Sequence, residues 1–382
     1  MCAIIKPSYK SCCVKPQKQQ LCESYYPTEK GDAMKKKILL IGLMCVVFAA
    51  CGLIMTGCGG GGGDDEGGSA DQITMRLASD APEDHIATGI NNWLCDEVEK
   101  RTEGRVKIDY YPSSQLGDYG TVYDEIKQGT IDAGQMTVPD ESDKRLSMPY
   151  IPYYATSFEE AAILYGPDSY MTKTFAQVLQ DQGVTFEGFL LEGFIGLGST
   201  VECPKAKEYG EKQGVKIRAA APFNFSLTVK DYGFDGVTIA YSETPTAIQT
   251  NVVQGWIGGT ANMNYAWVAD TIKYFYFNKV HAEATNYMIS NKTLEKLSDE
   301  DREIVEATFH EASEMSFTKA DENEHAYMDK MRDKGIEVVE FTDEEVQANA
   351  EKCREMTWPK IEKEYGKEVM DGLKADIEAL QK

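Results

Sequence analysis

An alternation of strand-like and helical segments near the start of the acidic part of the chain is the feature that most constrains the fold. Three short segments have the residue types and alternating spacing of strands: 73–78, 106–111 and 131–136. Between them, apolar residues recur at helical spacing from Ile86 to Val98, and a second helix is expected near 120–128, closed by Gly129. This β-α-β-α-β order predicts an α/β domain with a mostly parallel sheet, in which ligands bind at the carboxyl ends of the strands.

The rest of the chain continues the mixed pattern. Further strands are expected at 184–190, 215–218 and 236–239, and a helix at 242–251. Two acidic helices close the chain. Ser298 and Asp301 form a possible capping box at the start of the first, which runs to about Lys330, and Thr342 opens the second with a clearer one.

The N-terminal segment has the pattern of an export signal. Met34 is followed by three lysines and then by an apolar stretch at 38–54 that ends shortly before Cys58. Small residues just before Cys58 resemble a bacterial lipobox, which implies lipidation of this cysteine and removal of residues 34–57. A transmembrane helix is the alternative, because about 20 apolar residues can span a bilayer.

Composition separates this segment from the body of the protein. Residues 1–57 contain eight lysines and three acidic residues, whereas the whole chain has a net charge of -23. Residues 58–71 begin with a glycine run and are expected to form a flexible tether. Residues 1–33 precede a plausible natural start at Met34 and are interpreted as an N-terminal extension outside the fold.

Charge and motifs exclude several classes of function. The acidic body argues against nucleic acid and against electrostatic docking on an anionic membrane. Four cysteines from Cys58 onward form neither a disulfide framework nor a CxxC zinc site. No GxSxG, Walker or HExxH motif is present, and the four histidines are scattered. The segment Gly196–Thr200 is too short for a dinucleotide fingerprint and lacks the acidic partner that should follow it. An enzymatic function therefore has no support in the sequence.

Five motifs in order carry a resemblance to a known family. They are Pro112-Ser113-Ser114-Gln115-Leu116-Gly117, Gln128-Gly129-Thr130-Ile131-Asp132-Ala133, Met148-Pro149-Tyr150-Ile151, Gly214-Val215-Lys216-Ile217-Arg218 and the segment Tyr241 to Gly255. From about Ile73 to Leu380 the chain resembles the DctP-type substrate-binding subunits of TRAP (tripartite ATP-independent periplasmic) transporters. Each motif is weak alone, and their order over most of the chain makes the match specific.

The resemblance implies an α/β, two-lobed periplasmic-binding-protein fold of type II, with mostly parallel sheets flanked by helices. Crossing strands and a long spanning helix would join the lobes. We expect lobe I at 72–192, completed by 284–322, and lobe II at 193–283, completed by 323–382. The resemblance also implies an extracytoplasmic monomer that captures a small organic acid by lobe closure and delivers it to membrane permease subunits, without covalent chemistry, cofactor or metal.

Arg218 is the leading candidate for ligand binding. In the family the arginine of this motif grips a substrate carboxylate, and a planar guanidinium suits that role because it can donate two parallel hydrogen bonds. An ion pair on the surface is the alternative. The chain departs from the family at Ile195, where many members have a second arginine, and at Gly258, where an asparagine is expected. These departures favour a monocarboxylate with an apolar or aromatic body over a dicarboxylate.

Other candidates follow from their positions after strands or near these motifs. They are Asp80, His85, Gln135, Met136, Thr137, Glu192, Phe223, Asn224, Trp256 and Asn262, with Asn264 close by. Glu192 could bind an ammonium group or lie at the rim of the site. His85 could equally be a residue at a helix start, and the aromatic residues could equally be core. A receptor that feeds a sensor or another class of transporter remains an alternative function.

Overall fold

The computed structural model describes residues 72–380. Its strands are β1 (Ile73–Ser79), β2 (Val106–Tyr111), β3 (Ala133–Met136), β4 (Val184–Ser199), β5 (Lys216–Ala219), β6 (Asp235–Thr238), β7 (Gly255–Gly259), β8 (Tyr274–Ser290) and β9 (Glu337–Glu340). Its helices, with two 3₁₀ segments η1 and η2, are α2 (Ile86–Arg101), α3 (Tyr119–Gln128), η1 (Lys144–Tyr150), α4 (Phe158–Leu164), α5 (Tyr170–Gln180), α6 (Phe223–Tyr232), η2 (Tyr241–Glu243), α7 (Thr244–Gln249), α8 (Ala261–Val268), α9 (Asn291–Leu294), α10 (Asp299–Asp333), α11 (Asp343–Met356), α12 (Trp358–Tyr365) and α13 (Lys367–Leu380). The predictions made for residues 1–71, including the signal segment and lipidation of Cys58, concern residues outside the described part of the chain. No helix in 72–380 combines the length and apolarity needed to cross a membrane.

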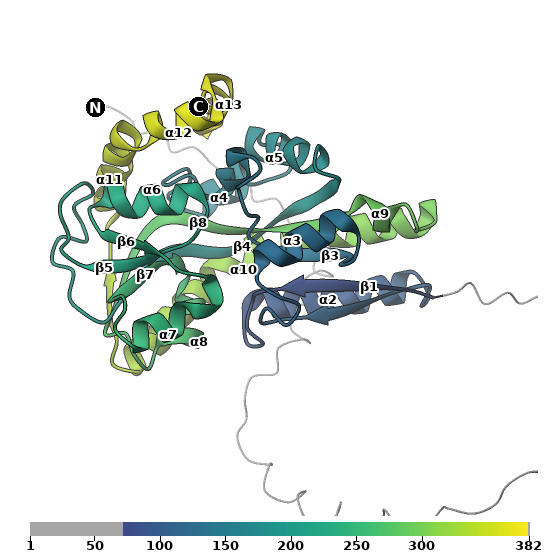
Figure 1. Cartoon of the computed structure of the whole chain (residues 1–382), viewed down its shortest axis with the longest axis horizontal. Coiled ribbons are helices and arrows are strands. Elements are labelled where there is room, and N and C mark those ends of the chain that lie inside the picture. The colour runs from purple at the N-terminus through teal and green to yellow at the C-terminus, as the bar shows by residue number, and fades with distance from the viewer. Residues whose placement is uncertain (1–71, 381–382) are drawn as a thin grey trace, which may run out of the picture. The chain divides into compact units, whose positions relative to one another are not determined.

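The described strands form one mixed sheet in the order β2-β1-β3-β8-β4-β7-β5-β6, with β9 paired to β8 (Figure 1). β1 pairs in parallel with β2 and β3, and β5 pairs in parallel with β6 and β7. Between these two parallel units the strands pair antiparallel: β3 with β8, β8 with β4, and β4 with β7. The prediction of a two-part, mostly parallel α/β fold is confirmed.

The long strands β4 and β8 join the two parallel units. They have 16 and 17 residues and pair along most of their length, with three shifts of register. β3 pairs with the end of β8 at 286–289, whereas β7 pairs with the end of β4 at 196–199. Both strands are almost entirely buried, and β8 buries polar residues such as Asn278, His281 and Asn286 among its apolar ones.

The long helix α10 spans both units, as the family resemblance implies. It packs against α2 in one unit and α8 in the other, and against β4 between them. Its N-cap, Ser298, accepts a hydrogen bond from the backbone of Asp301 at 3.1 Å, but the Asp301 carboxylate binds the Ser298 hydroxyl and not its backbone. The capping box is therefore half formed here, whereas the one at Thr342 has both bonds.

Two expected elements differ from the structure. The strand expected at 131–136 begins at Ala133, although the Asp132 carbonyl still accepts from the Ser290 backbone at 2.9 Å. The Asp132 carboxylate accepts from the Arg76 backbone and from Thr293. The helix expected at 242–251 is divided into η2 and α7. Asn251 has a left-handed φ of 59° and ends this region two residues after α7.

Candidate functional site

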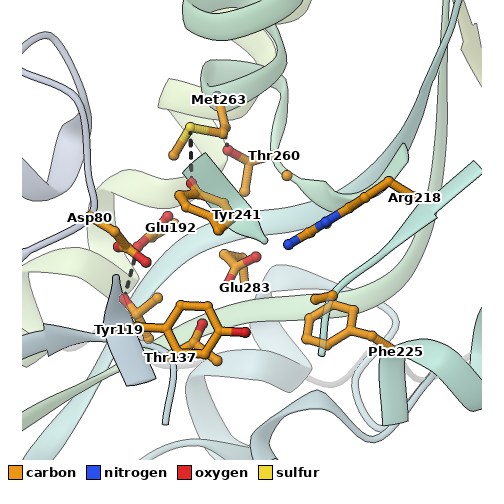
Figure 2. A pocket seen from close by; sticks show the side chains of 14 residues that line it. Asp80, Tyr119, Thr137, Glu192, Arg218, Phe225, Tyr241, Thr260, Met263 and Glu283 are labelled. Carbon is orange, nitrogen blue, oxygen red and sulfur yellow. Dashed lines mark hydrogen bonds between the residues drawn. The ribbon is translucent and has the colours of Figure 1, made fainter. Parts of the chain in front are cut away.

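A cavity lies where the carboxyl ends of β1, β3 and β5 approach the central strands β4 and β8 (Figure 2). The space between the atoms in the cavity and at its open mouth is about 470 Å³. Its lining consists of Asp80, Tyr119, Thr137, Glu192, Arg218, Ala220, Phe225, Tyr241, Gly258, Gly259, Thr260, Met263, Glu283 and Thr285. Residues from both parallel units contribute, as expected for ligand binding at the ends of parallel strands.

Arg218 brings a buried cation to the cavity from β5. Arg218 is only 1% exposed, and its Nε donates a hydrogen bond to the Ile239 carbonyl at 3.0 Å. The guanidinium carbon lies 5.8 Å from the centre of the Tyr241 ring. Both Nη atoms lack a partner among the described residues, and burial lowers the pKa of the group. Unpartnered buried donors are costly, so these atoms are suited to receive an anionic oxygen.

Three carboxyl groups line the same cavity. Burial raises the pKa of Asp80 to about 7, and burial together with the charge of Asp80 raises that of Glu192 to about 8. The pKa of Glu283 lies well above its ordinary value because of burial and of the neighbouring charges on Glu192 and Asp80. Glu192 Oε1 accepts from Gln135 at 3.2 Å and from Thr285 at 2.8 Å. Burial thus makes ionisation of these three carboxyls less favourable than it is in water.

His85 lies behind Glu192 and does not line the cavity. Its Nδ1 accepts from the Ala87 backbone at 3.3 Å, which makes it the N-cap of α2. Its Nε2 is 3.5 Å from Glu192 Oε2 without a well-formed hydrogen bond. Burial lowers the pKa of His85 to about 3, which disfavours a positive charge on the ring beside Glu192.

Gly258 explains one departure from the family pattern. Its φ of 151° favours glycine, and a Cβ there would lie 2.8 Å from Arg218 Nη1. The absence of a side chain thus leaves the space that the guanidinium occupies. Gly258 therefore makes room for the Arg218 guanidinium and provides no polar side chain for the ligand.

The other predicted residues are divided between the cavity and the core. Asp80, Thr137, Glu192, Arg218 and Gly258 line the cavity, and Gln135 supports Glu192 from behind. The structure places the following outside the lining: Met136, Ile195, Phe223, Asn224, Trp256 and Asn262.

The residues outside the lining have structural contacts of their own. Asn224 donates to the Ser147 carbonyl at 2.7 Å and to the Tyr365 hydroxyl at 2.8 Å. Trp256 is fully buried, with its indole N–H on Asn264. Met136 and Ile195 belong to the hydrophobic core. Phe223 begins α6, where its backbone N–H binds Asp140, and Asn262 is buried in α8.

Several lining residues were not among the sequence candidates: Tyr119, Ala220, Phe225, Tyr241, Gly259, Thr260, Met263, Glu283 and Thr285. A signal for two of them exists in β8. Glu283 and Thr285 alternate with Ala282 and Ala284, and a carboxyl is rarely buried in a strand without a charged partner or a role in binding.

Comparisons with known proteins identify the family of this chain. The family described as bacterial extracellular solute-binding protein, family 7 (DctP), matches residues 77–364. The sialic acid-binding periplasmic protein SiaP of Vibrio cholerae is 23% identical over 69% of this chain and 82% of its own length. The 2,3-diketo-L-gulonate-binding periplasmic protein YiaO of Escherichia coli is 22% identical over 71% of this chain and 81% of its own length.

Solved structures share the fold. A TRAP periplasmic solute-binding protein from Haemophilus influenzae with bound L-gulonate has a TM-score of 0.72 at 19% identity, covering 81% of this chain and all of the other. One from Desulfovibrio salexigens with bound orotic acid has a TM-score of 0.72 at 16% identity, covering 80% and 98%. Since the family match extends over most of the chain, this protein belongs to bacterial extracellular solute-binding protein family 7, the DctP-type substrate-binding proteins of TRAP transporters, and is a transport receptor and not an enzyme.

Proposed function

We propose that this protein captures a small organic anion through Arg218 and delivers it to the permease subunits of a TRAP-type transporter. The observation that carries the proposal is the pair of buried Nη atoms that face the cavity without a partner among the described residues. A carboxylate would satisfy both through two charge-assisted hydrogen bonds. The relatives that bind L-gulonate and orotic acid support this class of ligand, because both compounds are carboxylic acids.

The lining favours a single carboxylate on the ligand. Arg218 is the only cationic side chain among the lining residues, so a second carboxylate would meet no counter-charge there. Tyr119, Phe225, Tyr241 and Met263 offer apolar surface to the rest of the ligand. These contacts support a monocarboxylate whose body is partly apolar or aromatic.

The same proposal includes lobe closure and anchoring. Lobe I would comprise 72–192 with 284–322, and lobe II 193–283 with 323–382, closing over the cavity between them. The protein would act as a monomer held to the membrane by lipid on Cys58. This part of the proposal depends on the signal pattern and on the family.

A thermal-shift screen of small carboxylates against the purified protein tests the proposal. A ligand that binds only the folded state stabilises it by about 2.7 kcal/mol at a concentration of 100 times its Kd. We therefore expect at least one carboxylate to raise the melting temperature by roughly 5 °C. Failure of every carboxylate in a broad panel would contradict the proposed ligand class.

Substitution of Gly258 by alanine is expected to weaken carboxylate binding by about tenfold or more, since displacement of Arg218 breaks the paired hydrogen bonds. The added Cβ would lie 2.8 Å from Arg218 Nη1. Calorimetric titration of both proteins measures the effect. Gly120→Ala is a matched control, because a Cβ there meets nothing within 4 Å. Equal affinities for the Gly258→Ala variant and the wild type would show that the position of the guanidinium does not matter.

A further inference from the structure

The cavity has more acidic groups than its one cation can balance. Asp80, Glu192 and Glu283 line it together with Arg218, and no lysine or histidine is among the lining residues. Figure 2 shows the Arg218 guanidinium entering from one side, Asp80 and Glu192 on the opposite side, and Glu283 between them. The site therefore has a cationic end and an acidic end.

Two carboxyls buried elsewhere in the described residues have a cation that compensates their charge. Asp231 is bound by Lys360 at 2.7 Å, and Asp301 by Arg105 at 2.9 Å. Glu324 has no such cation, and burial raises its pKa to about 8, but each of its oxygens accepts a backbone N–H bond. Buried charges normally have such partners because desolvation is otherwise too costly.

The three cavity carboxyls lack an equivalent cation among the described residues. Glu192 receives neutral donors at Oε1, and its Oε2 lies 3.5 Å from Nε2 of His85, whose pKa is lowered by burial. Neither Asp80 nor Glu283 has an ion pair within the described chain; burial and the charge of Asp80 raise the pKa of Glu192, and burial and the charges of both raise that of Glu283. Three such groups in one buried site are costly, so a role in ligand binding is the simplest reason to retain them.

We propose that the bound solute is a zwitterion whose carboxylate lies on Arg218 and whose protonated amine lies among Asp80, Glu192 and Glu283. This inference rests on the proposed function and specifies its ligand as an amino carboxylate. An ammonium group has three donors and no acceptor, which suits a ring of carboxyl oxygens. Two of the three carboxyls would stay protonated and donate hydrogen bonds to the ionised one, so one positive charge is sufficient.

A hydroxy acid is the rival ligand, because neutral carboxyls could also bind hydroxyl groups. Matched pairs separate the two ideas. Each pair consists of an amino acid with about two to six carbons and a hydroxy acid with the same carbon skeleton. The amine of the one and the hydroxyl of the other are on the same carbon, either the α carbon or the terminal carbon. Melting temperature and calorimetric affinity are measured for the purified protein with each compound.

We expect the amino member of at least one pair to bind about 30-fold or more tightly than its hydroxy partner, as a charge-assisted contact in a buried site should. Asp80→Asn and Glu283→Gln should each lower amino-acid affinity by about tenfold or more and leave hydroxy-acid affinity unreduced. Glu322→Gln, an exposed carboxyl on α10, is the control and should change neither. Circular dichroism and the melting temperature of each unliganded variant confirm that it is folded.

The outcomes separate this inference from the proposed function. Hydroxy acids that bind as tightly as their amino partners, or variants that keep wild-type affinity for the amino acid, would overturn the ammonium site and leave carboxylate capture standing. Absence of binding by amino acids, hydroxy acids and simple carboxylates alike would overturn both.

Discussion

Replacement of Arg218 by glutamine is expected to lower the affinity for the bound carboxylate by roughly 100-fold or more, the effect of removing one partner of a buried charge pair. The wild-type guanidinium can direct two N–H donors at the ligand from a position that is 1% exposed. Glutamine keeps much of the volume but loses the charge and the forked geometry. Calorimetric titration with the carboxylate found by the thermal-shift screen measures the loss.

The unliganded Arg218→Gln variant should be as stable as the wild type or more stable. In the empty protein the guanidinium is desolvated, which lowers its pKa, and neither Nη has a partner among the described residues. Removal of a desolvated charge whose two Nη groups have no hydrogen-bond partner relieves part of that cost. Arg76→Gln, a partly exposed arginine in β1 outside the cavity, is the matched control. Wild-type affinity in the Arg218→Gln variant would show that the carboxylate is held elsewhere.

Replacement of Glu324 by alanine is expected to reduce the free energy of unfolding by about 3 kcal/mol or more, the cost of two buried donors left without partners. Glu324 is fully buried in α10. Its Oε1 accepts from the Ala261 backbone at 2.7 Å, and its Oε2 from the Phe194 backbone at 3.2 Å. The side chain thus connects the spanning helix to β4 and to the start of α8. Urea unfolding followed by circular dichroism measures the change.

A graded series tests this account of Glu324. Glutamine keeps one acceptor oxygen but turns an amide N–H₂ toward the other backbone donor, so Glu324→Gln should be less destabilised than Glu324→Ala. Glu322→Ala removes an exposed carboxyl two residues earlier on the same helix and should change stability by less than about 0.5 kcal/mol. Equal stabilities of Glu324→Ala and Glu322→Ala would contradict the role of the two backbone bonds.

Gly193 shows why Glu324 can reach these donors. Its φ is 145°, and a Cβ at this position would overlap Glu324 Oε2. Glycine is therefore required where β4 passes α10. Because Glu192 precedes this glycine and Thr260 precedes Ala261, the same contact also positions two lining residues of the cavity. Stability and site geometry are coupled at this point of the fold.

Sequence patterns correctly predicted the elements with strong local signals. The α2 and α3 helices follow from apolar spacing and from Gly129, which is the left-handed C-cap of α3. The position of Arg218 at the end of a strand followed from the order of motifs. Weaker signals failed at element boundaries: β3 begins at Ala133, and the helix expected at 242–251 is divided into η2 and α7.

The sequence by itself determined the family, the α/β order and the arginine that faces the cavity, because these depend on local periodicity and on motifs in a fixed order. Only the tertiary structure decided which neighbours share the cavity with Arg218. β4 and β8 are buried on both faces, so polar alternation does not show which face of each strand meets the ligand. Register and strand crossing placed Glu192 and Glu283 beside Asp80 and left Ile195 in the core, and so produced an acidic end to the site.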